Sequence, residues 1–168
     1  MHIDLPRGIN PAAIFQLHRP MRSAGLGRHR FGPWTLEIQR DAFTGVLSCS
    51  LRAHRMVFMH ASVAFQFSPN LNTFDADYRR DSAAAMPWRT NLMALAGHGV
   101  RFQTDDLRNP SGGLVAIPYN AIMGAQAVWI RPSPRSTPVR FKVDRLPIAL
   151  EVAKRDGCDR SLLGAEPE

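Results

Sequence analysis

The feature that most constrains the fold is an alternation of apolar and polar residues, which recurs in three successive stretches, residues 34–40, 46–53 and 56–67. Successive side chains of a β-strand point to opposite faces of a sheet, so this period of two is typical of a strand with one buried face. Connections of only a few residues separate the three stretches. We therefore expect an antiparallel meander, in which strands that follow each other along the chain pair side by side.

The alternation also predicts which side chains face the core. In the second stretch, the face that we expect to be buried carries Leu47, Cys49, Leu51 and Ala53. The third stretch is typical of one long strand, whose buried face would carry Val57, Met59, Ala61, Val63, Phe65 and Phe67. On this interpretation His54 lies in a turn and His60 lies on the exposed face of the strand.

Residues 74–80 continue the period of two and contain two carboxylates two positions apart. Asp75 and Asp77 would share the exposed face of a strand, about 6–7 Å apart, and two carboxylates at that distance can share a cation. Arg79 comes next in the same row, however, and such a series is typical of a solvated strand face. We therefore expect no metal site here. The opposite face, with Phe74, Ala76 and Tyr78, is expected to be buried.

Helical signals lie in the second half of the chain. A short middle helix is predicted over residues 90–99, where a Thr can cap the start and a Gly can end the last turn. One helical turn is predicted over residues 118–124. A C-terminal helix is predicted between Asp144, which we expect to be its N-cap, and Gly157, because the apolar residues between them follow helical spacing.

Strands are also predicted in this half, over residues 114–118, 126–132 and 139–144, and the last two are expected to form a hairpin. Together the elements predict an α+β fold. Its main part is an antiparallel β-sheet, arranged as a meander or like a sandwich. The short middle helix and the C-terminal helix pack against it.

The domain boundaries follow from size and composition. A chain of 168 residues, 45% of them hydrophobic, suits one domain, which we place at residues 33–160. Residues 1–32 are basic, rich in Pro and Gly and without periodicity, so we expect a flexible tail, and residues 161–168 are expected to form a second one. No convincing signal peptide is visible near the N-terminus. Either the protein stays inside the cell or its export signal is missing from this sequence.

The chain has only two cysteines, Cys49 and Cys158, which lie too far apart for a CxxC pair. In a reducing cytosol they would be two buried thiols. In an exported protein they would form one disulfide that closes a loop of about 110 residues. The inward position of Cys49 does not suit a nucleophile, which needs an exposed thiolate. We predict a disulfide between the two cysteines under oxidising conditions.

The chain is strongly basic, with a net charge of +7, and such a charge can favour nucleic acid or an anionic surface as a partner. The candidate contact residues for an anion or a nucleic acid are Arg79, Arg80, Arg89, Arg101 and Arg108, with Tyr78 and Trp88 as stacking platforms. Arg108 also begins a Gly-rich turn that could form an anion-binding nest. Against this interpretation, the two aromatic residues are in phase with core positions. We therefore favour the interpretation that the arginines are scattered solubilising charges.

Catalytic patterns are weak. Ser62, His60 and Asp75 could be imagined as a catalytic set, but no Gly-x-Ser-x-Gly elbow is present. The histidines lack zinc-ligand spacing, and the chain lacks a phosphate-binding P-loop. We therefore expect no catalytic residue, no metal and no cofactor.

Three motifs resemble a family of small secreted proteobacterial domains, the type VI secretion-associated VasI-like group, and more loosely the invasion-associated locus B group. The matching residues are Tyr78, Arg79, Asp81 and Trp88, then Gly124, Ala125, Ile130 and Arg131, then Phe141, Val143, Leu146 and Ala149. The resemblance covers about residues 46–158 and rests on packing residues. It implies a non-enzymatic accessory or binding domain, periplasmic or secreted, whose partner is another envelope protein or surface. The alternative is a cytosolic basic protein that binds nucleic acid.

Overall fold

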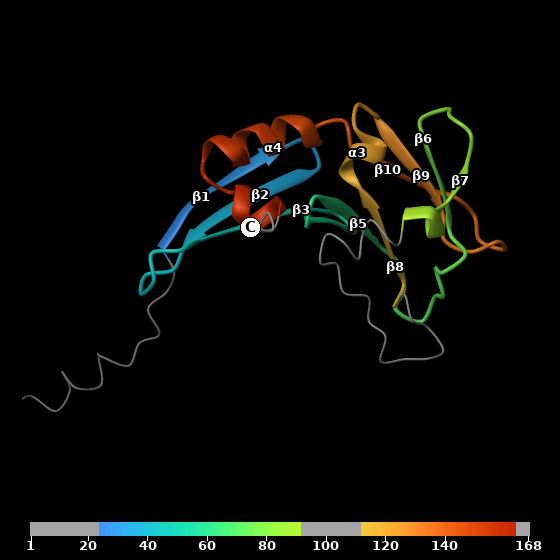
Figure 1. Ribbon diagram of the computed structural model, residues 1–168, viewed down its shortest axis with the longest axis horizontal. Coiled ribbons are helices and arrows are strands. Elements are labelled where there is room, and N and C mark those ends of the chain that lie inside the picture. Colours follow the sequence, from blue (N-terminus) through green and yellow to red (C-terminus); the bar gives the residue numbers. More distant parts are fainter. Residues whose placement is uncertain (1–23, 92–111, 164–168) are drawn as a thin grey trace, which may run out of the picture.

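A computed structural model describes residues 24–91 and 112–163, which form two antiparallel sheets with helices packed against them (Figure 1). The larger sheet has the order β1-β2-β3-β4-β5-β8. Its strands are β1 (Ala24–Phe31), β2 (Trp34–Arg40), β3 (Leu47–Ala53), β4 (Met56–Met59), β5 (Ser62–Gln66) and β8 (Leu114–Pro118). The predicted α+β class and the meander are therefore confirmed.

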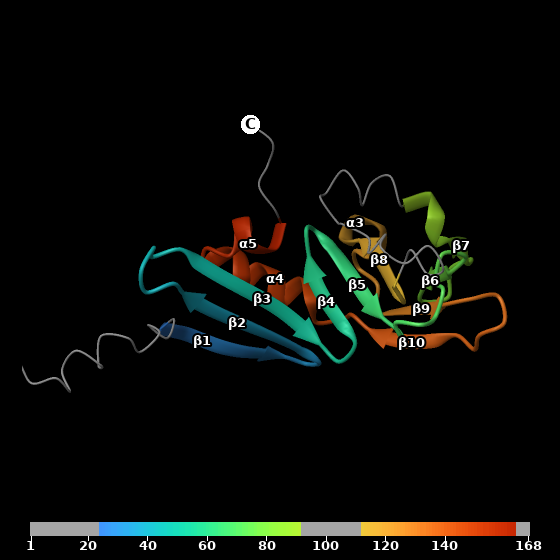
Figure 2. The ribbon, with the colours of Figure 1, turned by 90° about the horizontal axis from the view of Figure 1, so that it is seen from below.

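The smaller sheet has the order β10-β9-β6-β7. Its strands are β10 (Val139–Lys142), β9 (Ala127–Arg131), β6 (Asp77–Arg80) and β7 (Met86–Pro87). The described helical segments are η1 (Trp88–Asn91), α3 (Tyr119–Ile122), α4 (Leu146–Arg155) and α5 (Asp159–Leu163). Helix α4 lies over β1 and β2 at one end of the molecule, and the smaller sheet lies at the other end (Figures 1 and 2).

The strands form where alternation gives each sheet a buried face. In β2, Trp34, Leu36 and Ile38 are buried, while the residues between them are partly exposed. The predicted hairpin of β9 and β10 is present, and its register pairs Ile130 with Val139. Side chains of both sheets and of α3, α4 and α5 belong to one hydrophobic cluster. Burial of these apolar side chains is the main contribution that holds the two sheets together.

Aromatic side chains link the two sheets directly. The Phe141 ring on β10 packs edge-to-face against Phe65 on β5, with centroids 4.9 Å apart. Trp88 is fully buried, and its indole N–H donates a hydrogen bond of 2.6 Å to the carbonyl oxygen of Ala116 on β8. Trp34 is equally buried, but its indole nitrogen has no hydrogen-bond partner within the described ranges.

Helix α4 has one apolar side. Leu146, Ala149 and Ala153 are buried, at the spacing that brings residues to one face of a helix. The predicted end of this helix is confirmed, since Gly157 follows the last turn with a φ of +85°, where L side chains are strained. Its start differs from the prediction by one residue, because Arg145 and not Asp144 is the N-cap.

The structure differs from the expected boundaries at both ends. Strand β1 lies within the segment expected to be a tail, and it pairs with β2 along its length. Its glycines and a bulge between Gly25 and Gly27 remove the alternation that would have revealed it. At the other end, α5 continues to Leu163 and buries Leu162 against the core.

The stretch 56–67 is not one strand. The chain reverses at His60 and Ala61, which both have positive φ, 46° and 55°, and β4 pairs with β5 across this turn. The reversal changes which side chains face the core. Met56 and Phe58 are buried in β4, whereas Met59, which we expected inside, is 38% exposed.

One further expectation differs from the structure, and another lies largely outside the described residues. Phe74 was expected to face the core, but it is 39% exposed because regular strand structure begins only at Asp77. The middle helix predicted over residues 90–99 lies outside the described residues, apart from the last positions of η1. Among the helices that the structure describes, none is both long and apolar enough to cross a membrane.

Candidate functional site

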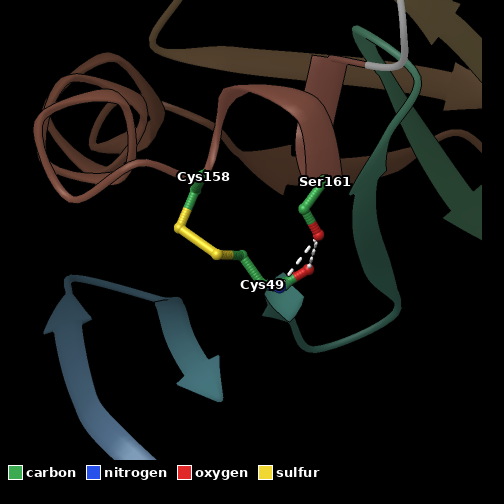
Figure 3. The surroundings of a disulfide bond; sticks show 3 residues. All are labelled: Cys49, Cys158 and Ser161. Atoms are coloured by element: carbon green, nitrogen blue, oxygen red, sulfur yellow. Dashed lines mark hydrogen bonds between the residues drawn. A yellow bond between two sulfur atoms is a disulfide. The ribbon is translucent and has the colours of Figure 1, made fainter. Parts of the chain in front are cut away.

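The two cysteines meet between the larger sheet and the C-terminal helices (Figure 3). The sulfur atoms of Cys49 and Cys158 are 2.15 Å apart, within bonding distance, and the two α-carbons are 5.7 Å apart. Cys158 is fully buried and Cys49 is 8% exposed. The two cysteines are therefore adjacent, as predicted. A bond between their sulfur atoms joins β3 to the short connection between α4 and α5.

A hydroxyl group completes this junction. The Ser161 hydroxyl accepts a hydrogen bond from the Cys49 N–H, at 2.8 Å, and donates one to the Cys49 carbonyl oxygen, at 3.0 Å. Strand β4 pairs with β3 only from Leu51 to Ala53, so it does not reach the backbone of Cys49. The side chain from α5 therefore satisfies backbone groups that the sheet leaves unpaired, as buried peptide groups require.

Three of the five arginines predicted to contact an anion, Arg79, Arg80 and Arg89, lie within the described residues. The Arg80 side chain donates a hydrogen bond of 2.9 Å to the carbonyl oxygen of Met123. Arg89 forms an ion pair with Asp75 at 2.8 Å. Arg101 and Arg108 lie outside the described residues, whereas Gly112 and Gly113 of the Gly-rich turn lie inside them, with φ of 55° and 71°. Arg79 lies beside another basic residue, Arg131, on the surface of the smaller sheet.

The stacking platforms predicted beside these arginines are buried. Tyr78 is 3% exposed and Trp88 is 0% exposed, so neither can stack on a base in this structure. Their burial follows from their phase with the core, because Tyr78 lies on the inner face of the smaller sheet and Trp88 packs against β8.

Ion pairing explains the two carboxylates of the stretch 74–80. Asp77 forms an ion pair with Arg131 across β6 and β9, and Asp75 pairs with Arg89. Within the described ranges, no three acidic, histidine or cysteine side chains gather as a metal site. Of the imagined catalytic set, Ser62 is fully buried in β5, and its hydroxyl donates a hydrogen bond to the His60 carbonyl oxygen.

Asp81, a residue of the family resemblance, has a packing role. Its carboxylate accepts hydrogen bonds from the N–H groups of Gln126, at 3.1 Å, and Ala127, at 3.0 Å. Its own N–H donates to the Ala127 carbonyl oxygen. Asp81 directly follows the last residue of β6 and has a φ of 46°. These hydrogen bonds therefore fix the turn through which the chain leaves the strand.

A different basic surface appears on the outward side of the smaller sheet. Tyr78 and Ile130 form a cross-strand pair and are both buried, so their neighbours along each strand point outward. We call this surface the basic face, and it carries Arg79, Trp129, Arg131, Arg140 and Lys142. Trp129 lies at its centre, directly opposite Arg79 on one side and Arg140 on the other.

The basic face contains a hollow of about 380 Å³. The guanidinium carbon of Arg79 lies over the Trp129 ring, 5.3 Å from its centroid, which is a cation–π arrangement. Arg131, paired with Asp77, lines another wall. Sequence reasoning missed Trp129 because it identified aromatics near Arg79 along the chain, and not the aromatic that faces Arg79 across the sheet.

The chain matches no protein-family model, and no curated protein or solved structure is significantly similar to it.

Proposed function

We propose that the protein is a non-enzymatic binding domain, periplasmic or secreted, that acts as an accessory to another envelope protein or surface. The observation that carries this proposal is the buried Cys49–Cys158 pair at bonding distance. Disulfides persist in the periplasm and outside the cell, whereas the bacterial cytosol keeps thiols reduced. The family resemblance supports the same compartment.

The basic face supports binding rather than a reaction. The residues that line its hollow are arginine, tryptophan, tyrosine, alanine and proline with one paired carboxylate, and none of them is a serine, cysteine or histidine. Such a surface offers fixed donors and an aromatic ring, which are means of recognition. The proposed partner is an anionic group on an envelope component.

The test is the oxidation state and the location of the native protein. Cells that produce it from its own gene are fractionated, free thiols are blocked by alkylation before lysis, and the purified protein is analysed by mass spectrometry with N-terminal sequencing. We expect no alkylated cysteine, a periplasmic or extracellular fraction and a processed N-terminus. Two alkylated cysteines on a cytosolic protein that retains Met1 would refute the proposal.

The second candidate function is binding of nucleic acid in the cytosol. The net charge of +7 and the arginines that flank Trp129 favour it. Binding of single-stranded DNA and RNA is measured at two salt concentrations. A nucleic-acid binder loses affinity steeply as salt rises, because bound phosphates release counterions. If affinity is weak and salt changes it little, this candidate is rejected.

A further inference from the structure

In the hollow of the basic face, shape, positive charge and aromatic surface coincide. We propose that this hollow binds a small ligand that carries an oxyanion beside a ring, such as a sugar phosphate or a nucleotide. In this arrangement Arg79 holds the oxyanion, with Arg131 beside it in the hollow, and Trp129 contacts the face of the ring. The inference rests on the proposed binding function, to which it adds a site and a class of ligand.

The charges of the face favour an anion. Across the centre of the sheet the outward residues are Arg140, Trp129 and Arg79, one from each of three neighbouring strands. The next row holds Arg131 and Asp77, which form an ion pair, so Arg79 is the main cation that the hollow offers to an anion. The Arg79 guanidinium lies over an aromatic ring instead of against a carboxylate, so its N–H groups are available to an incoming oxyanion.

The side chains that would make these contacts are already restrained. The indole ring holds Arg79 from one side, and Asp77 holds Arg131 across the strands. An arginine that is free in water loses side-chain entropy when it binds a ligand, whereas a restrained arginine has less to lose. The restraint therefore favours binding without adding any contact.

The size and walls of the hollow suit one ring and one oxyanion. Its volume of about 380 Å³ lies near the lower end of the range for small-ligand sites. Ala83, Ala84 and Ala85 form a wall of small side chains, and Pro138 closes another side. These apolar walls complement the faces of a ring, and they would stabilise a ligand by removing apolar surface from water.

Tryptophan fluorescence provides the readout. The chain has three tryptophans, and Trp34 and Trp88 are fully buried, whereas Trp129 is partly exposed in the hollow. Glucose 6-phosphate and adenosine 5′-monophosphate are titrated into the oxidised full-length protein, together with inorganic phosphate, glucose and adenosine. Calorimetry measures the same affinities independently of fluorescence, and the variant Trp129→Phe assigns the optical signal.

We expect each ring phosphate to bind at least about tenfold more tightly than inorganic phosphate and than its uncharged counterpart, because only the complete ligand engages both the arginines and the ring. Arg79→Gln should weaken binding about tenfold or more, whereas the matched control Arg28→Gln should leave it unchanged. Arg28 is also exposed, but it lies on β1 and pairs with Glu37. A tenfold preference for one ring phosphate identifies the source of the ligand, and equal affinities support the shared chemistry.

Two outcomes overturn the inference. One is that no ring phosphate binds more tightly than inorganic phosphate, which would make the face a general anion surface. The other is that Arg79→Gln and Arg28→Gln weaken binding equally while both retain the wild-type urea midpoint. Neither outcome bears on the oxidation state of the cysteines. The inference can therefore fail while the proposed function stands, and an alkylated cytosolic protein would refute the proposed function alone.

Discussion

Removal of the cross-link between Cys49 and Cys158 should destabilise the protein more than any other change of comparable size. The change is the double variant Cys49→Ala/Cys158→Ala, together with wild-type protein treated with a reductant. Both proteins keep the side chains around the junction, including the Ser161 hydroxyl that binds the backbone of Cys49. We expect the free energy of unfolding to fall by about 5 kcal/mol in each case.

The magnitude follows from the loop that the bond closes. The two cysteines are separated by 109 positions. In the chain-entropy model, a cross-link over a loop of this length lowers the entropy of the unfolded chain by about 16 cal/mol/K, or about 5 kcal/mol at 25 °C. Single domains typically have a total stability of about 5–15 kcal/mol. Loss of the bond is therefore expected to leave the protein with little remaining stability.

The assay is urea unfolding followed by circular dichroism, with linear extrapolation to water. Three proteins are compared: oxidised wild type, reduced wild type and the double alanine variant. The oxidised protein should also show the smallest slope against urea, because its cross-linked unfolded state is more compact and exposes less surface.

The comparison separates the cross-link from the packing of the sulfur atoms. Reduced wild type retains both sulfurs but lacks the bond, so it should resemble the alanine variant if the cross-link is what matters. A loss below about 1 kcal/mol on reduction would refute the reasoning, since the entropy of a long loop predicts several times more. A large loss in the alanine variant alone would assign the effect to packing.

Three further outcomes are expected. Ser161→Ala should lower the free energy of unfolding by about 1–3 kcal/mol, measured in urea, because it leaves two backbone groups of β3 without partners. Trp88→Phe should be about 1 kcal/mol more destabilising than Trp34→Phe, since both remove a buried indole but only Trp88 loses a hydrogen bond; equal losses would contradict this. Hydrogen bonds, first from the Thr44 N–H, lower the pKa of the Asp41 carboxyl below its ordinary value of 3.8. The stability that the ionised Asp41 carboxyl contributes is therefore fully present above that value and is lost as the pH falls through the lowered pKa. An NMR titration of the carboxyl, which measures this pKa, checks the prediction.

The sequence predicts the sheet wherever burial on one face leaves a period of two. Strands β2, β3 and β10 follow this rule, and the residues that they bury are on the expected faces. The alternation does not reveal strand β1, because the glycines and exposed side chains of this strand do not alternate between apolar and polar. The alternation also fails to reveal the division between β4 and β5, because the turn at His60 and Ala61 lacks the Gly, Asn or Asp that usually marks a two-residue hairpin.

The candidate site was only partly predictable. Alternation alone places Arg79 and Trp129 on the outward faces of their strands. Their contact depends on the register between β6 and β9, which pairs residues 50 positions apart in the chain. Register across such a distance is set by the packing of the whole core, and no local pattern reveals it. The cysteine pair was predictable because only one pairing exists for two cysteines.

The position of the cystine also constrains the order in which the molecule can mature. Every strand of both sheets precedes Cys158 along the polypeptide. Because the ribosome synthesises the chain from its N-terminus, Cys49 on β3 emerges with a free thiol long before Cys158 is made. Helix α4, which covers β1 and β2, arrives just as late. The early sheet therefore stays uncovered during most of synthesis, and its apolar surface is exposed to aggregation for that time.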